Sequence, residues 1–188
     1  MACRQIGVLG SEDKRQVTVV TACAADGTML PCQTIFEGKT EATLPPKVVL
    51  DKPELKDFDW TQSTNHWSNM ETTKRWFQNI LMPYLRNQFF ITGIQKAVLL
   101  LDCWNVHLAA EFREWVAATY PEVVILYIPA GCTPIGQPCD IAVQRPFKHA
   151  ITGAFNEWSM NSIVTQMRAG AKVEQLSMDL RISNLKPR

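Results

Sequence analysis

The sequence of 188 residues lacks the features that mark exported and membrane-spanning proteins. Its first ten residues contain no apolar core of the length that a signal peptide needs. No uninterrupted apolar run approaches the roughly 18 residues that a membrane span requires. We therefore expect no membrane partner. With no export signal, we expect the six cysteines to be reduced thiols rather than a disulfide framework.

An excess of charge of one sign is also absent. The formal net charge is +1, which neither predicts a basic nucleic-acid surface nor excludes a local one. There is no internal repeat and no low-complexity block. What remains is an ordinary globular composition, 46% hydrophobic and 20% charged, on a chain of one domain's length. We assign residues 1–160 to that domain and residues 161–188 to a loosely packed or partly helical tail.

The most informative stretch runs from Ala97 to Lys148. Residues 98–101 are four aliphatics without polar alternation, which is typical of a strand buried on both faces. An amphipathic helix over 108–119 and a second apolar run over 123–128 follow. The order strand, helix, strand predicts an α/β fold with these two strands parallel and joined by a right-handed crossover.

Two aspartates in this stretch are the main candidate site residues. Asp102 follows the first predicted strand, at the sheet edge where ligands bind in open α/β folds. Asp140 follows a turn-rich passage that we expect to lack regular structure. A carboxylate after buried aliphatics must be solvated, paired or bound to a cation. We therefore predict a divalent-metal site. The alternative for Asp102 is a loop aspartate that caps a helix, and for Asp140 an N-cap.

Other polar residues nearby are weaker candidates for a role in the site. His107 and Asn105 are possible auxiliary groups at the site, with a hydrogen-bonded structural role as the alternative for His107. Arg145, Lys148 and His149 form a small basic cluster after Asp140 that could contact a phosphate backbone, although a solvated helix face explains it equally well.

Cys132 and Cys139 are too far apart in sequence for finger-like zinc spacing, and we expect buried or loop thiols. Trp104 and Trp115 are expected in the core or a subunit contact rather than as base-stacking platforms.

The flanking sequence predicts further elements. Val17–Cys23 and Leu30–Phe36 are expected to form an antiparallel hairpin across an Asp-Gly turn. Residues 41–65 are expected to be an irregular surface excursion with a short strand at 48–50. A helix should begin at the capping box Ser68–Glu71 and be disturbed by Pro83. A last helix should begin near Asp140 or after Pro146, with weaker periodicity beyond 159 and a loosely attached tail over 172–188.

These residues resemble a known family. Residues 99–107 (LLLDCWNVH) and 129–148 (PAGCTPIGQPCDIAVQRPFK) are similar to the second and third catalytic blocks of DDE superfamily endonucleases of the pogo/Tigger-like transposase type. Residues 13–40 resemble the hairpin between the first and second catalytic positions of that family, and residues 65–85 the helix before the second block. The similarity extends over about residues 5–151 in the family's order.

The resemblance implies a ribonuclease-H-like fold, a mixed sheet flanked by helices, and metal-dependent cutting and joining of DNA. The family's site is three carboxylates around two Mg²⁺ or Mn²⁺ ions, of which Asp102 matches the second and Asp140 the third. The first would lie upstream of the hairpin, where residues 1–10 hold no acidic residue, and Asp13 and Asp26 do not match it. We therefore expect two of three ligands and a sheet without its first strand.

Three functions follow from the resemblance. The first is a DDE endonuclease domain whose two-metal cleavage is impaired. The second is a catalytically inactive remnant that binds DNA or a protein partner, and the third is a poorly folded fragment. An open strand edge would favour self-association under the second and third hypotheses. The resemblance also implies a nuclear location, DNA as the partner and no small-molecule substrate.

Overall fold

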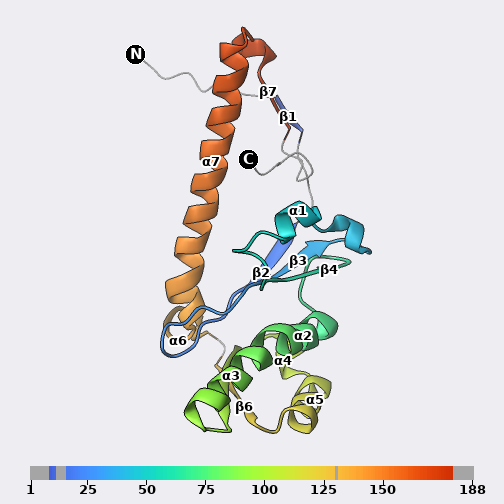
Figure 1. Cartoon of the computed structure of the whole chain (residues 1–188), viewed down its shortest axis with the longest axis vertical. Coiled ribbons are helices and arrows are strands. Elements are labelled where there is room, and N and C mark those ends of the chain that lie inside the picture. Colours follow the sequence, from blue (N-terminus) through green and yellow to red (C-terminus); the bar gives the residue numbers. More distant parts are fainter. Residues whose placement is uncertain (1–8, 12–15, 130, 180–188) are drawn as a thin grey trace. The chain divides into compact units, whose positions relative to one another are not determined.

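A computed structural model of the chain describes residues 9–11, 16–129 and 131–179, with its elements labelled in Figure 1. The described residues form a mixed α/β structure, as the sequence predicts. They divide into two compact units, one of residues 16–145 and one of residues 1–15 with 146–188. Within the described ranges, no helix combines the length and the apolar character needed to cross a membrane.

The unit of residues 16–145 contains a three-stranded sheet. Strand β2 (Val17–Val20) pairs antiparallel with β3 (Gln33–Glu37), which confirms the predicted hairpin. The Asp-Gly turn between them is also present, with Gly27 at φ 88°, a conformation that favours glycine. The backbone N–H of Thr28 donates to Asp26 Oδ1 at 2.8 Å, and this hydrogen bond lowers the pKa of Asp26.

The prediction for residues 41–65 was wrong in two respects. Residues Lys47–Leu50 form the short helix α1 rather than a strand, because the Pro46 carbonyl accepts the N–H groups of Val49 and Leu50 and so starts a helical turn. A one-turn 3₁₀ helix spans Glu41–Thr43. The excursion then ends in strand β4 (Asp59–Ser63), which the sequence analysis missed and which pairs parallel with β3.

A long helical segment follows. Helix α2 (Met70–Trp76) begins one residue later than predicted, because Asn69 rather than Ser68 is its N-cap and exchanges reciprocal hydrogen bonds with Thr72. A π-helical turn over Phe77–Leu81 leads into α3 (Met82–Thr92), whose first turn holds Pro83. Pro83 therefore disturbs the regular helix as predicted, since it lacks a backbone donor. Gly93 ends α3 in the left-handed conformation.

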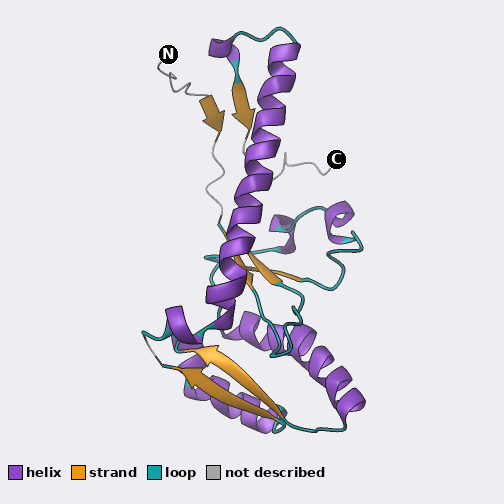
Figure 2. Ribbon diagram, turned by 90° about the vertical axis from the view of Figure 1, so that its left-hand side faces the viewer, coloured by secondary structure: helices purple, strands orange, loops and turns teal. Residues whose placement is uncertain are grey.

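Strands β5 (Ala97–Asp102) and β6 (Val123–Ile128) form a second, parallel sheet in the same unit, as predicted. Helices α4 (Asn105–Leu108) and α5 (Ala110–Thr119) connect them. Figure 2 shows the two strands side by side with helices on one face. On that face Leu99 and Leu101 pack against a cluster that includes Phe77 and Phe112.

The expected burial of β5 on both faces was wrong. Val98 and Leu100 are 64% and 51% exposed, and their register partners Val124 and Leu126 are 44% and 50% exposed. An all-aliphatic run contains no alternation, so it cannot distinguish a strand covered on one face from a strand covered on both. The second face of the β5–β6 sheet is therefore an apolar, solvent-exposed surface.

The chain after β6 is more regular than predicted. A one-turn helix α6 (Thr133–Gly136) and a π-helical turn over Cys139–Val143 precede α7 (Gln144–Arg168), which continues past the predicted loss of periodicity at 159. In the other unit, β7 (Ser177–Asp179) pairs parallel with β1 (Leu9–Ser11) after a 3₁₀ turn over Val173–Gln175. Gln166 of α7 bonds the backbone of Ser177, so residues 172–179 are structured, and residues 180–188 of the predicted tail lie outside the described residues.

Candidate functional site

Asp102 lies where the sequence predicts it, as the last residue of β5. It pairs in register with Ile128 at the end of β6, so the carboxyl ends of the two parallel strands meet at its position. Its side chain is 49% exposed. Because residues two apart along a strand share a face, Asp102 lies on the same exposed face as Val98 and Leu100. The carboxylate is thus placed at a sheet edge of the kind that binds ligands in α/β folds.

His107 is the one predicted auxiliary residue that the structure brings to Asp102. Its Nδ1 lies 2.6 Å from Asp102 Oδ1, and because an ionised carboxylate can only accept, the ring N–H is the donor. The backbone carbonyl of His107 accepts a hydrogen bond from the Tyr127 hydroxyl at 2.7 Å. Burial raises the pKa of Tyr127, so the hydroxyl keeps its proton for this contact. His107 is therefore held from both sides, whereas Asn105 is an exposed residue at the start of α4.

Asp140 lies in the π-helical turn that precedes α7 and is half-buried. Its neighbour Cys139 places its thiol 3.7 Å from the thiol of Cys23, which lies three residues after the end of β2. Burial raises the pKa of Cys139 to about 11, and the hydrogen bond with Cys23 acts in the same direction. The contact between the two sulfurs thus joins the turn that carries Asp140 to the hairpin.

The predicted metal ligands, Asp102 and Asp140, are both carboxylates. Two carboxylates suit hard ions such as Mg²⁺ and Mn²⁺. Among the residues that the structure describes, however, no group of three or more His, Cys, Asp and Glu side chains is arranged to hold a metal ion. The described side chains therefore fall short of a complete two-ion centre, and metal ligation by Asp102 and Asp140 stays a prediction.

The predicted basic cluster lies at the start of α7. Arg145, Lys148 and His149 are all exposed, and their spacing of three and four places them on one side of the helix. Exposed cations grouped on a helix are suited to contact an extended anion such as a phosphate backbone. Trp115, by contrast, packs against Phe77 in the core, as predicted, with 5.6 Å between ring centroids.

A buried carboxylate that the sequence does not predict lies at the other sheet. Asp59, at the start of β4, is 5% exposed and accepts hydrogen bonds from Gln33 Nε2 at 2.8 Å, Arg75 Nε at 2.8 Å and Asn79 Nδ2 at 2.9 Å. The donors come from β3, α2 and the π-helical turn, so this carboxylate fastens the sheet to the helix. Gln33 lies 26 positions before Asp59, and Arg75 and Asn79 lie 16 and 20 positions after it, so only the tertiary structure identifies the group.

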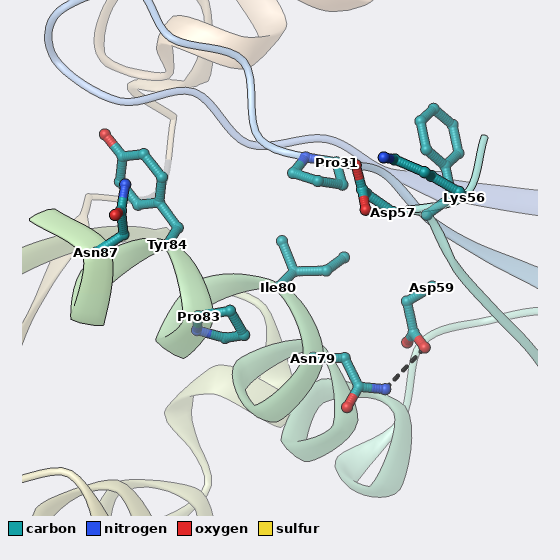
Figure 3. A pocket seen from close by; sticks show the side chains of 10 residues that line it. Pro31, Lys56, Asp57, Asp59, Asn79, Ile80, Pro83, Tyr84 and Asn87 are labelled. Carbon is teal, nitrogen blue, oxygen red and sulfur yellow. Dashed lines mark hydrogen bonds between the residues drawn. The ribbon is translucent and has the colours of Figure 1, made fainter. Parts of the chain in front are cut away.

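A hollow of about 540 Å³ adjoins Asp59. Figure 3 shows Asp59 and Asn79 on one side of it and Tyr84 with Asn87 on the other, with Pro31 and Pro83 between. Its lining includes the cationic side chain of Lys56 and the carboxylate of the next residue, Asp57. The hollow contains neither Asp102 nor Asp140 and is therefore separate from the candidate site.

Comparison with known proteins identifies the class. The chain belongs to the DDE superfamily endonuclease family, whose model matches residues 14–183. Among curated proteins it is 26% identical, over 166 residues, to a human protein described as "Pogo transposable element with ZNF domain". The recognition of a pogo-like DDE domain from residues 99–107 and 129–148 is thereby confirmed.

The extent of these matches differs between the two chains. The alignment covers 80% of this chain but 10% of the human protein, so the chain spans about a tenth of the length of that relative. No solved structure matches the chain. The family match thus shows the family, and the structure is of the mixed α/β class. Because the alignment covers 10% of the human protein, the activity of a whole transposase-derived protein does not carry over to this chain.

Proposed function

We propose that this chain is a transposase-derived DDE endonuclease domain of ribonuclease-H-like fold that binds DNA in the nucleus. Two-metal strand cleavage is its ancestral reaction, and in a polypeptide of these 188 residues that reaction is impaired. The observation that carries the proposal is the family match over residues 14–183, together with Asp102 at the carboxyl end of β5 and Asp140 before α7. Parallel pairing of β5 with β6 and the β2–β3 hairpin agree with such a fold.

The proposed ligands of Mg²⁺ or Mn²⁺ are Asp102 and Asp140. When bound, a pair of such ions activates the attacking oxygen and stabilises the leaving oxygen of a phosphodiester. His107 orients Asp102 for such a role, because it holds the oxygen Oδ1 and, among the described residues, no side chain is hydrogen-bonded to Oδ2. A missing carboxylate ligand costs several kcal/mol of transition-state stabilisation, or roughly a thousandfold in rate. The proposed consequence is slow cleavage.

The first prediction concerns cleavage. Incubated with supercoiled DNA and Mn²⁺, the purified chain is expected to nick slowly, and Asp102→Ala is expected to remove this nicking. Asp57→Ala, which removes an exposed carboxylate far along the chain from Asp102, is the matched control and should nick as the unmodified chain does. Gel electrophoresis of the relaxed product measures the rate. Equal product from all three proteins would exclude metal-dependent cleavage by Asp102.

A second candidate function is a catalytically inactive remnant that binds DNA or a protein. The absence of a group of three metal-ligating side chains from the described residues favours it. A thermal-shift titration with Mn²⁺ separates the two candidates. Stabilisation of the unmodified chain that Asp140→Asn abolishes supports a metal-holding domain, and an identical lack of response in both supports the inactive remnant.

The second prediction concerns DNA binding, which both candidates share. We expect the double variant Arg145→Ala/Lys148→Ala to bind duplex DNA more weakly, without regard to sequence. The slope of log affinity against log salt concentration should fall by about 2, since each phosphate contact contributes about 0.9. Fluorescence anisotropy at several salt concentrations measures this slope. Lys39→Ala removes an exposed cation at the end of the hairpin and is the control. An unchanged slope in the double variant would contradict the assignment of α7 as a DNA-contacting surface.

A further inference from the structure

The thiols of Cys23 and Cys139 form a contact that the proposed function does not use. Their Sγ atoms lie 3.7 Å apart although the two residues are separated by 116 positions in sequence. Both side chains are partly exposed, so small molecules in solution can reach them. Both belong to the unit of residues 16–145. The fold, rather than the local sequence, therefore brings these two cysteines together.

The pair is distinct from the other described cysteines. The Cys103 thiol donates to the carbonyl of Ile128 at 3.0 Å, whereas the Cys139 thiol, which also lies 3.7 Å from the Thr21 carbonyl, faces a second thiol. A structural zinc site requires four ligands, and no group of three or more metal-ligating side chains exists among the residues whose positions are described. Two facing thiols without further ligands are suited to one covalent reaction, the formation of a disulfide.

We propose that Cys23 and Cys139 are a redox modification site, at which a hydroperoxide converts the two thiols into an intramolecular disulfide. In the first step the hydroperoxide oxidises one thiol to a sulfenic acid and is itself reduced, to water in the case of hydrogen peroxide. In the second step the other sulfur attacks the sulfenic sulfur, an S–S bond forms, the S–O bond breaks and water leaves. The two thiols lose two hydrogen atoms in total.

The geometry favours this product. A disulfide requires the two sulfurs to approach to about 2.0 Å. From their present separation of 3.7 Å, the two side chains must together close a gap of less than about 2 Å. The proposal requires that rotation about the Cα–Cβ bonds of the two cysteines supplies this movement. The new bond would tie the hairpin covalently to the turn that carries Asp140. The formation of the bond does not depend on the proposed function of Asp140.

Mass spectrometry of the full chain tests the proposal. The chain is treated with hydrogen peroxide, remaining thiols are blocked with N-ethylmaleimide, and the protein is digested without reduction. We expect a linked pair of peptides that contain Cys23 and Cys139, lighter than the separate peptides by the mass of two hydrogen atoms. Recovery of both cysteines as maleimide adducts, as separate sulfinic acids, or in disulfides with other cysteines would overturn the proposal.

Thermal unfolding provides a second readout with matched controls. A disulfide that closes a loop of more than a hundred residues should raise the Tm of the treated chain by roughly 5–10 °C, reversibly with dithiothreitol. Cys103→Ser and Cys132→Ser should retain this rise, and Cys23→Ser should lose it. The peptide measurement on the unmodified chain decides the matter even if a variant fails to fold. A linked pair without any nicking activity would leave this proposal standing and would contradict only the cleavage proposed above.

Discussion

Phe77→Ala is expected to lower the free energy of unfolding by about 3–5 kcal/mol, the range for removal of a fully buried aromatic ring. Phe77 is 0% exposed and lies at the centre of the core, with ring centroids of Trp76, Phe112 and Trp115 each 5.6 Å away. These neighbours come from α2 and α5, so the cavity would loosen the contact between two helices.

Urea denaturation followed by circular dichroism measures this loss. Phe90→Ala is the matched control, because Phe90 lies on α3 and is 89% exposed, and its replacement should change stability by no more than about 0.5 kcal/mol. Phe77→Leu should fall between the two, since it leaves a smaller cavity. Equal losses for Phe77→Ala and Phe90→Ala would contradict the placement of Phe77 in the core.

Asp59→Ala is expected to cost about 2–3 kcal/mol of unfolding free energy, because it removes the acceptor shared by three donors. Gln33 is 0% exposed, and its amide nitrogen also donates to the Thr72 carbonyl at 2.8 Å. The N–H group that donates to Asp59 therefore cannot turn to water when the carboxylate is lost. Arg75 contributes less, because its side chain is 46% exposed and is resolvated easily. The lost hydrogen bond from the buried Gln33 amide therefore accounts for most of the expected decrease in unfolding free energy.

The comparison variant is Asp57→Ala, two residues earlier, which removes an exposed carboxylate and should be almost neutral. Asp59→Asn tests the role of charge, since it preserves the shape of the side chain but weakens the bond from Arg75. We expect its cost to be smaller than that of Asp59→Ala. Chemical denaturation of the three variants provides the values, and a neutral Asp59→Ala would show that the three bonds contribute nothing to stability.

The elements that the sequence predicts are those with a local pattern. The β2–β3 hairpin follows from its Asp-Gly turn, and β5 and β6 follow from their aliphatic runs. Strand β4 escapes prediction because its buried positions are Asp59, Thr61 and Ser63, so its inward face is polar and shows no apolar alternation. Asp59 on that face accepts hydrogen bonds from β3, α2 and the π-helical turn, and these partners are not readable from the strand's own sequence.

The candidate site was predictable to a similar degree. The position of Asp102 at the end of a strand follows from the sequence. His107 is predicted only as a possible auxiliary residue, and the structure adds its contact with Asp102. The surroundings of Asp140 do not follow, because they depend on the approach of Cys23 from a hairpin more than a hundred residues earlier. The burial of β5 was misjudged for the opposite reason, since its composition is uniform and only the packing distinguishes its two faces.

The solvent-exposed apolar face of the β5–β6 sheet influences how strongly Asp102 can bind a cation. Val98, Leu100 and Asp102 alternate with the inward residues of β5, so the carboxylate and the aliphatic side chains share one surface. Any molecule that packs on this surface would displace water from the carboxylate together with the aliphatics, and the effective dielectric constant around Asp102 would fall. The affinity of Asp102 for a cation would then be a property of the assembled complex rather than of the isolated polypeptide.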